Sequence, residues 1–433
     1  MKWKSSCILV IALLLAFTAH AQNIHVNGRW IIGPCGDTLI LKGVNYAPYN
    51  WGWSPEELLI DQIALTGANC VRLPWYESTP DGAQPQVTYD DMAKLDAVLA
   101  ACVDQGMIPI LDLHDQKCAN DPAALIALAN WYLRPDVMAV LAPYAQDMII
   151  NVANEALNVI WTNNPAAAQA TFVSTYSTVI GNLRNGGITM PLMIDGPDCG
   201  INLDVLAEVG NQLLQADPLG NLIFSAHGYW HSFANNDPAQ MQTKIDQALD
   251  QGIPLVMGEV ANLQDDAQMC QYTLDHNSLL NICTDARVGW LAWSWDHDGC
   301  SARQISTNGL ASNLTPYGNA IVNNPDHGLM VNTVRSAHLV LEDCGPAGIV
   351  DAMPADNAWQ AVVDPGRHLI QIHGLHTLKQ AYLLDLLGKP LPLAQAGSNS
   401  YRYGALPTGL YVLVVITRDG GMRTCKMYVH ADA

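Results

Sequence analysis

Eight short apolar runs, separated by stretches typical of amphipathic helices, limit the fold of this chain more than any other feature. Stretches such as 89–105 and 240–251 lie between the runs, and each is followed by a glycine suited to ending a helix. Strands that alternate with helices pair in parallel through right-handed crossovers. Eight such units predict an α/β protein with a (β/α)8 TIM barrel. The apolar runs are residues 38–46, 69–75, 107–114, 148–155, 190–197, 222–229, 254–260 and 289–295.

A doubly wound open sheet is the main alternative to the barrel. Such a sheet normally carries a glycine-rich phosphate turn after its first strand. Here the first run ends in the sequence GVNYAP (43–48), which is not a turn of that kind. The residues just before it, 27–37, are expected to form a hairpin that closes the barrel floor, and the last barrel helix is expected near 317–323 and 333–341.

The first 21 residues are typical of an export signal. A basic start with Lys2 and Lys4 precedes an apolar run at 7–17 that is too short to span a bilayer, and Ala19-His20-Ala21 resembles a cleavage site. A buried first helix is the alternative. Export predicts a secreted or cell-surface protein. Cys7 would leave with the signal, so 10 of the 11 cysteines would remain, an even number that suggests disulfides whose pairing cannot be read from sequence.

After the barrel the periodicity changes from helix-like to strand-like. We expect a catalytic barrel domain over residues 22–342 and a linker rich in Gly, Pro, Ala and Asp over 343–356. Short strands separated by turn signals then predict a small all-β sandwich over 357–433. These strands are expected at residues 368–373, 382–387, 401–403, 410–417 and 423–429.

The charge balance narrows the possible partners. The 20 Lys and Arg residues stand against 40 Asp and Glu residues, which gives a net charge of −20. A chain this acidic is not expected to bind nucleic acid or an anionic membrane. The balance suits a neutral substrate.

Two glutamates end strands that should face each other across the barrel mouth. Glu155 is the last residue of the fourth apolar run, and Glu259 is the last but one of the seventh. Reactive residues of such barrels lie at the C-terminal ends of the strands. Two carboxyl groups that flank one bond are what glycoside hydrolysis requires, because one must donate a proton to the leaving oxygen while the other attacks the anomeric carbon. The alternative is that each glutamate is only a solvated residue at a strand end.

Five segments at the ends of the expected strands carry a resemblance: CVRLPW (70–75), NVANEA (151–156), SAHGYW (225–230), MGEVAN (257–262) and GWLAWSWDHD (289–298). Together they resemble glycoside hydrolase family 5, a family of retaining β-glycanases on a (β/α)8 barrel. The resemblance covers most of residues 24–341 and is closest to the bacterial β-mannanase-like subgroup. The chain departs from that subgroup at Ala156-Leu157, where an aromatic is expected, and at Asp296-His297-Asp298, which replaces a glycine-asparagine turn. Both departures bear on sugar preference.

The resemblance implies a role for each residue of the site. Glu155 resembles the general acid/base and Glu259 the nucleophile. Asn154 resembles the residue that hydrogen-bonds the 2-position of the sugar. Arg72 and Tyr229 resemble the residues that hold the nucleophile ionised and oriented. His114 and His227 resemble polar wall residues of the central subsite. Trp293 resembles the stacking platform of that subsite, and Trp295 is a further candidate platform.

These features predict an exported endo-β-1,4-glycanase that acts on a plant-type polysaccharide, with β-mannan or glucomannan ahead of β-glucan. A non-catalytic polysaccharide-binding barrel is the hypothesis from another class. We expect no cofactor and no catalytic metal, because the chain lacks the His-x-His segment after strand one that is typical of metal-dependent amidohydrolases. A structural ion near Asp296 and Asp298 stays open, and a monomer is expected.

The C-terminal strands also carry a resemblance. Leu384, Leu386 and Gly388, the segment LPTGLYVL (406–413) and Lys426 are similar to the sorting domain of the type IX secretion system. This resemblance implies that bacterial secretion machinery is a partner of the domain. The alternative is a carbohydrate-binding sandwich.

Overall fold

The computed structural model describes the barrel almost completely and the C-terminal strands in part. The expected signal (1–21) and the expected linker (343–356) lie outside the described residues. Described are residues 23–49, 53, 57–78, 90–231, 234–265, 269–341, 360–364, 367–373, 378–384, 390–397, 399–406, 409–417 and 422–429.

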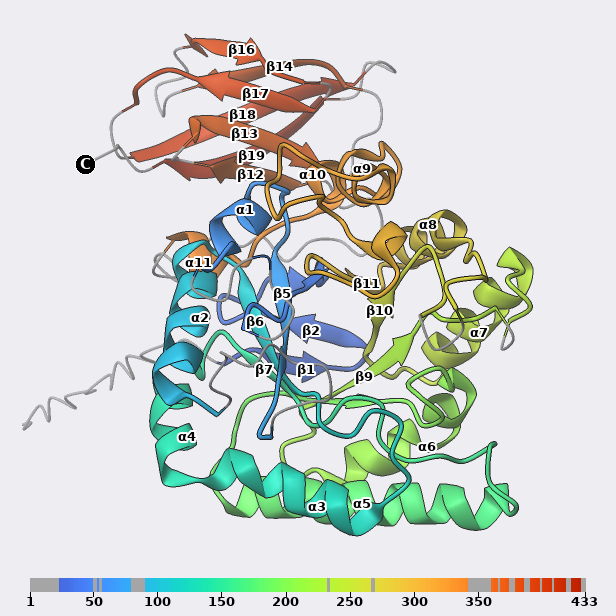
Figure 1. Ribbon diagram of the computed structural model, residues 1–433. Coiled ribbons are helices and arrows are strands. Elements are labelled where there is room, and N and C mark those ends of the chain that lie inside the picture. Colours follow the sequence, from blue (N-terminus) through green and yellow to red (C-terminus); the bar gives the residue numbers. More distant parts are fainter. Residues whose placement is uncertain are drawn as a thin grey trace, which may run out of the picture.

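Eight parallel strands form a closed barrel, as the apolar runs predicted (Figure 1). Going round the barrel, the order is β10-β11-β4-β5-β6-β7-β8-β9, so neighbours in sequence are neighbours in space. Almost every residue of these strands is buried, because helices cover the outside and side chains fill the inside. The strands are β4 (Lys42–Asn45), β5 (Cys70–Trp75), β6 (Ile108–Leu113), β7 (Ile149–Asn151), β8 (Leu192–Asp195), β9 (Leu222–His227), β10 (Leu255–Val260) and β11 (Gly289–Ala292).

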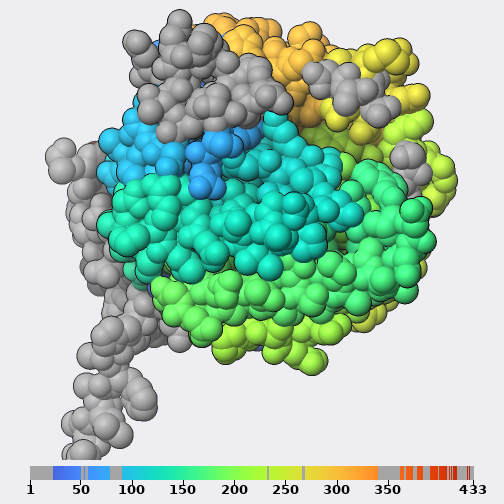
Figure 2. All heavy atoms as spheres, turned by 60° about the horizontal axis from the view of Figure 1, so that its bottom comes forward, coloured from blue at the N-terminus to red at the C-terminus, as the bar shows by residue number. Residues whose placement is uncertain are grey.

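Helices surround the barrel in chain order. Figure 2 shows this as colours that follow one another round the molecule from cyan through green to yellow and orange. Several helices begin at an aspartate whose carboxylate accepts from backbone N–H groups of the first turn, for example Asp91 at α2 and Asp121 at α3. The helices are α1 (Ile60–Ala64), α2 (Met92–Asp104), α3 (Pro122–Ala129), α4 (Pro135–Leu141), α5 (Pro165–Asn185), α6 (Leu203–Ala216), α7 (Pro238–Asp250) and α8 (His276–Ala286).

A small antiparallel sheet closes the N-terminal end of the barrel. It consists of β1 (His25–Asn27), β2 (Trp30–Ile32) and β3 (Thr38–Leu39), so the expected hairpin has a third strand. Its apolar side chains, among them Ile31 and Leu39, pack in one cluster with side chains from inside the barrel. The other end of the barrel is therefore the open one.

Three short helices and two sheets follow the barrel. The helices are α9 (Pro316–Asn323), α10 (Leu329–Asn332) and α11 (Ala337–Leu341). The expected helix over 333–341 is wrong in its first half, because only 337–341 is helical. The all-β sandwich is confirmed: one sheet has the order β12-β13-β17-β16 and the other β15-β14-β18-β19, and residues of both sheets share one apolar cluster.

The sandwich lies next to α9 and α10 (Figure 1). A hydrogen bond joins the two parts, from Nδ1 of His373 to the carbonyl oxygen of Val331 at 3.0 Å. The prediction missed β12, β15 and β16. The strands of the sandwich are β12 (Gln360–Asp364), β13 (Leu369–His373), β14 (Leu378–Leu384), β15 (Pro390–Leu391), β16 (Leu393–Gln395), β17 (Ser400–Tyr403), β18 (Gly409–Thr417) and β19 (Met422–Val429).

Two disulfides join loops at the open end of the barrel, Cys118–Cys199 and Cys270–Cys300. Within the described chain, Cys70, Cys102 and Cys283 are unpaired and buried. No single helix in that part of the chain has the length and apolar character needed to cross a membrane, although α3 and α4, with the turns that follow them, reach that length and character as one bent pair.

Candidate active site

The predicted site residues meet at the open end of the barrel, around a cavity of about 1000 Å³. Glu259 lies within β10, and Glu155 lies in the loop after β7. Glu155 has a left-handed backbone with φ of 52°, a conformation that is rare for a residue with a side chain. Six of the predicted residues border the cavity: His114, Asn154, Glu155, Tyr229, Glu259 and Trp293.

The two glutamates face each other closely. One carboxylate oxygen of Glu155, one of Glu259 and a ring nitrogen of His227 all lie within 4.8 Å of one another. Carboxyl groups of retaining glycosidases are about 5–5.5 Å apart, whereas inverting enzymes need about 6.5–9.5 Å to admit a water molecule. The separation here matches the shorter arrangement.

Glu259 is held as an anion by two donors. Nη1 of Arg72 donates to its Oε1 at 2.7 Å, and the hydroxyl of Tyr229 donates to its Oε2 at 2.8 Å. Burial opposes ionisation of this carboxyl group, but the charges of His227 and Arg72 outweigh it and hold the pKa of Glu259 below its usual value. A buried carboxylate stabilised in this way is suited to be the nucleophile.

Arg72 also organises the floor of the site. Its guanidinium is fully buried and donates to Asn45, Asn151 and Asn154 at 2.8–2.9 Å. The same group lies 3.1 Å from Asp112 and 3.4 Å from Asp195. Arg72 therefore does not border the cavity but fixes the residues that do.

Glu155 has the opposite environment. Burial raises its pKa to about 7, although Nδ1 of His227 donates to its Oε1 at 2.7 Å and partly offsets the effect of burial. A carboxyl group with a pKa near neutrality can keep a proton until the substrate takes it. The two glutamates thus differ in the way that an acid and a nucleophile must.

His227 is more than the cavity wall that the resemblance implied. Its side chain is completely buried between Glu155 and Asp195, with Nε2 3.5 Å from the Asp195 carboxylate. Burial alone would lower the pKa of His227, but Glu259 and Asp195 raise it well above its usual value, so the ring is an imidazolium. The loop at Gly200 passes so close that a Cβ there would meet the His227 ring at 2.5 Å.

His114, by contrast, borders the cavity as expected. Its Nδ1 donates to Asp112 at 2.7 Å. Burial, together with the charge of Arg72, lowers the pKa of His114 to about 3, so the ring is neutral at ordinary pH. The His114 and Trp293 rings are nearly parallel, with their centres 5.7 Å apart.

The two predicted tryptophans have different surroundings. Trp293 borders the cavity, and its Nε1 donates to Asp298 at 2.7 Å. Trp295 is completely buried and does not border the cavity, so the expectation that it stacks on a sugar is wrong. Its carbonyl oxygen accepts from Nε1 of Trp53. Its role is in packing.

Sequence reasoning missed a chain of polar groups behind Tyr229. Nη2 of Arg303 donates to the Tyr229 hydroxyl at 3.2 Å, and Nε of Arg303 lies 3.4 Å from Asp298. Arg303 ends a short 3-10 helix (Ser301–Arg303) after β11, so no strand end marked it. Asp195 was visible as a carboxylate at a strand end, but its contacts with Arg72 and His227 were not.

Among the residues that the structure describes, two clusters of side chains have the composition of a metal site. One consists of the two facing glutamates, Glu155 and Glu259, together with His227. The other consists of Cys118, Glu155 and Cys199, but its two sulfurs are joined in a disulfide and are not thiolate ligands. The two aspartates considered for an ion already accept from the protein, Asp296 from the Ala47 N–H and Asp298 from Trp293 and the Cys300 N–H.

A closed (β/α)8 barrel with two close carboxyl groups at its open end, one of raised and one of lowered pKa, is typical of the class of barrel glycoside hydrolases. Residues 34–299 match the family model of cellulase (glycosyl hydrolase family 5), and the chain belongs to that family.

Individual relatives agree with this assignment. The chain is 27% identical over 304 residues to a mannan endo-1,4-beta-mannosidase of Salipaludibacillus agaradhaerens, an alignment that covers 70% of this chain and 91% of the relative. It is 26% identical over 336 residues to the enzyme of the same name from Cellvibrio japonicus, covering 76% and 72%. Among solved structures, a beta-mannanase from Streptomyces thermolilacinus with mannohexaose is 25% identical, with a TM-score of 0.61 and coverage of 73% of this chain and 98% of that one.

Proposed function

We propose that this protein is an endo-β-1,4-mannanase that hydrolyses β-mannan or glucomannan with retention of configuration. The observation that carries the proposal is the close pair Glu155 and Glu259, one with a raised and the other with a lowered pKa. The mannan-degrading relatives favour mannan over cellulose as the substrate.

The reaction begins with attack by Glu259 on the anomeric carbon. The glycosidic C–O bond breaks, and Glu155 gives its proton to the leaving oxygen, so that a covalent glycosyl-enzyme forms. Glu155 is then ionised and takes a proton from water, whose oxygen attacks the same carbon and releases Glu259. The two displacements together retain the configuration, and Glu155 ends the cycle protonated.

The neighbours of the pair bind the sugar in the reacting position. Asn154 accepts from Arg72 through Oδ1, which leaves its amide N–H groups for the hydroxyl at the 2-position. The indole of Trp293 offers an apolar surface to the C–H face of the pyranose. Trp161 and Tyr272 border the same cavity and are 55% and 41% exposed. Aromatic surface therefore continues to the rim of the cavity, which suits a polysaccharide that is cleaved at internal bonds.

A panel of polysaccharides tests the proposal. We expect the purified protein to release oligosaccharides from mannan and glucomannan and much less from cellulose and xylan. Glu155→Gln and Glu259→Gln variants should lose nearly all of this activity while remaining folded by circular dichroism. Preferred hydrolysis of cellulose would make the protein an endoglucanase instead. Binding without hydrolysis would favour the polysaccharide-binding barrel, which the presence of both carboxyl groups argues against.

We also propose that the protein is exported and that the C-terminal sandwich serves sorting through a bacterial secretion machinery. The support is the sequence of residues 1–21 and the resemblance carried by residues 384–426. A protein truncated before Asp356 should hydrolyse soluble mannan at nearly the full rate, because both glutamates lie in the barrel. In the native host it should accumulate inside the cell envelope. If only binding to insoluble polysaccharide is lost, the sandwich is a carbohydrate-binding domain.

A further inference from the structure

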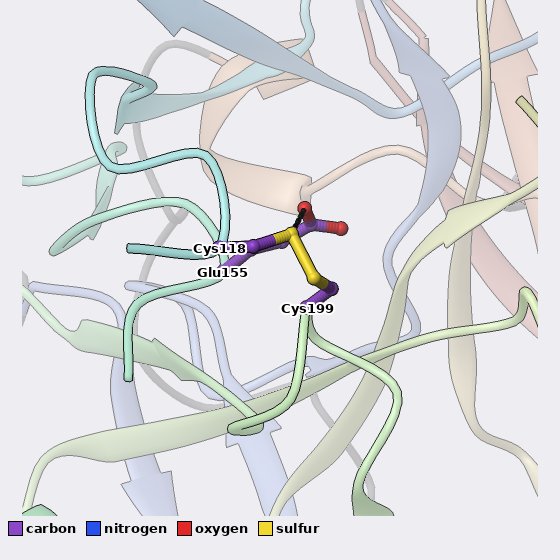
Figure 3. Close-up of side chains that lie close together, drawn as sticks. All are labelled: Cys118, Glu155 and Cys199. Atoms are coloured by element: carbon purple, nitrogen blue, oxygen red, sulfur yellow. Dashed lines mark hydrogen bonds between the residues drawn. A yellow bond between two sulfur atoms is a disulfide. The ribbon is translucent and has the colours of Figure 1, made fainter. Parts of the chain in front are cut away.

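The disulfide Cys118–Cys199 lies directly beside the acid/base (Figure 3). Cys118 belongs to the loop after β6 and Cys199 to the loop after β8, and 81 residues separate them in sequence. Glu155 lies in the loop after β7, between those two loops. Both cysteines border the cavity together with Glu155. The covalent link therefore spans the loop that carries the acid/base.

The disulfide contacts one particular oxygen of Glu155. Sγ of Cys118 lies 3.3 Å from Oε2 of Glu155 (Figure 3). The other oxygen, Oε1, accepts from His227. An oxidised sulfur has no proton to donate, and it is a weak acceptor. Because His227 occupies Oε1, the acid proton belongs on Oε2. The disulfide thus excludes water from this side of Oε2 without competing strongly for its proton.

The backbone beside the disulfide needs support from its surroundings. Cys118, Glu155 and Cys199 all have positive φ, of 63°, 52° and 57°. Their neighbours Leu157 and Asp198 also have positive φ, of 71° and 58°. Such conformations are unfavourable for residues with side chains and persist only where the surrounding structure fixes them. The three loops must therefore hold one another in place.

Hydrogen bonds join the same three loops. The N–H of Leu157 donates to the carbonyl of Ala119, and the N–H of Asp198 donates to the carbonyl of Leu157, both at 2.9 Å. The carboxylate of Asp198 accepts from the N–H of Val159 at 2.8 Å. These bonds and the disulfide enclose Glu155 from two sides.

We propose that the disulfide Cys118–Cys199 is a positioning element for the acid/base, which fixes the Glu155 carboxyl group in the cavity and keeps hydrogen-bond donors away from its Oε2. This inference rests on the proposed glycosidase function. It assigns no chemical step to the sulfurs.

The first test separates acid catalysis from general damage by varying the leaving group. Phenyl β-mannobioside needs protonation of its leaving oxygen, whereas 2,4-dinitrophenyl β-mannobioside does not. In the Cys118→Ala/Cys199→Ala variant we expect kcat/KM for the phenyl substrate to fall about 10-fold or more. For the dinitrophenyl substrate it should change by no more than about twofold, because the nucleophile and the sugar contacts remain. An equal loss on both substrates would overturn the proposal.

The second test uses two variants that differ only in a donor. Cys199→Ala leaves a thiol on Cys118 that can donate to Oε2, and Cys118→Ala/Cys199→Ala leaves none; both lack the covalent link. A donor favours ionised Glu155, so the basic limb of the pH profile of kcat/KM should lie about one pH unit lower in Cys199→Ala than in the double variant. Identical basic limbs would show that Oε2 does not sense this sulfur, and would contradict the proposal.

The second disulfide provides a matched control. Cys270→Ala/Cys300→Ala removes a link between other loops at the same end of the barrel. Any loss it causes should be equal for the two leaving groups. A steeper loss on the phenyl substrate in this control would show that the signature is not specific to Cys118–Cys199. If the unaltered protein hydrolyses neither mannobioside nor mannan, the proposed function itself fails.

Discussion

Tyr229→Phe should raise the pH at which the nucleophile ionises. The hydroxyl of Tyr229 donates to Oε2 of Glu259 at 2.8 Å, and both side chains are buried. A hydrogen bond to a charged group contributes about 1.5–3 kcal/mol. One pKa unit corresponds to about 1.4 kcal/mol, so losing this bond should raise the pKa of Glu259 by about one to two units. Removing a donor favours the protonated form, which fixes the direction of the shift.

The measurement is the pH profile of kcat/KM on soluble mannan. Glu259 must be ionised to attack, so the acid limb should move to higher pH by about one to two units. Tyr317→Phe is the matched control, because its hydroxyl is also buried near β10 but donates to the carbonyl of Val260 at 2.7 Å. That variant should lose some stability while its acid limb stays in place.

Two results would refute this reasoning. An unchanged acid limb in Tyr229→Phe would mean that Arg72 and His227 alone set the ionisation of Glu259. A shift of the basic limb without a shift of the acid limb would mean that the roles of the two glutamates are reversed. Because the groups interact, each limb reports the pair, and the two limbs must be compared within one profile.

Three further predictions follow from the same contacts. Folding raises the pKa of Glu155 from 4.5 to about 7, so its contribution to stability is complete below pH 4.5 and is lost as pH rises through 7. Over that range the free energy of unfolding of Glu155→Gln, measured in urea, should rise by up to about 3 kcal/mol relative to the native protein. A difference that does not change with pH would contradict this prediction. Exhaustive treatment with EDTA should leave most of the mannanase rate, because acid and nucleophile are both side chains; a loss restored by one metal ion would disprove this. Trp293→Ala should lower kcat/KM about 10-fold or more, while Trp295→Phe should lower the melting temperature and leave KM unchanged.

The barrel could be predicted because its strands are buried on both faces. Each therefore appears in the sequence as a continuous apolar run, and the eight runs gave the strand order directly. The glutamates could be predicted for a related reason, since the fold brings the C-terminal ends of distant strands to one place. Glu155 and Glu259 are 104 residues apart in the printed sequence, yet both were assigned to the same site.

Contacts made by loops could not be predicted in the same way. Trp293 and Trp295 were both expected as stacking platforms, but β11 ends at Ala292, and beyond it the alternation of a strand no longer applies. Arg303 lies in a short 3-10 helix after β11, and Cys118 and Cys199 lie in turns. In such segments, spacing in sequence carries no information about distance. His227 was recognised, but whether it faced the cavity or the carboxylates depended on packing.

Burial and the surrounding charges together explain why Glu155 keeps its proton. Two cations, Arg72 and the His227 imidazolium, lie among four carboxyl groups. The pKa values of Asp195 and Glu259 are lowered although burial opposes it, because both cations act on them. Burial raises those of Asp112 and Glu155. With Asp195 and Glu259 ionised, ionisation of Glu155 would add a further buried anion, which would share the His227 imidazolium with both of them. The proton that the reaction needs is held on Glu155 mainly by burial, helped by the negative charges of Glu259 and Asp195 and opposed by His227.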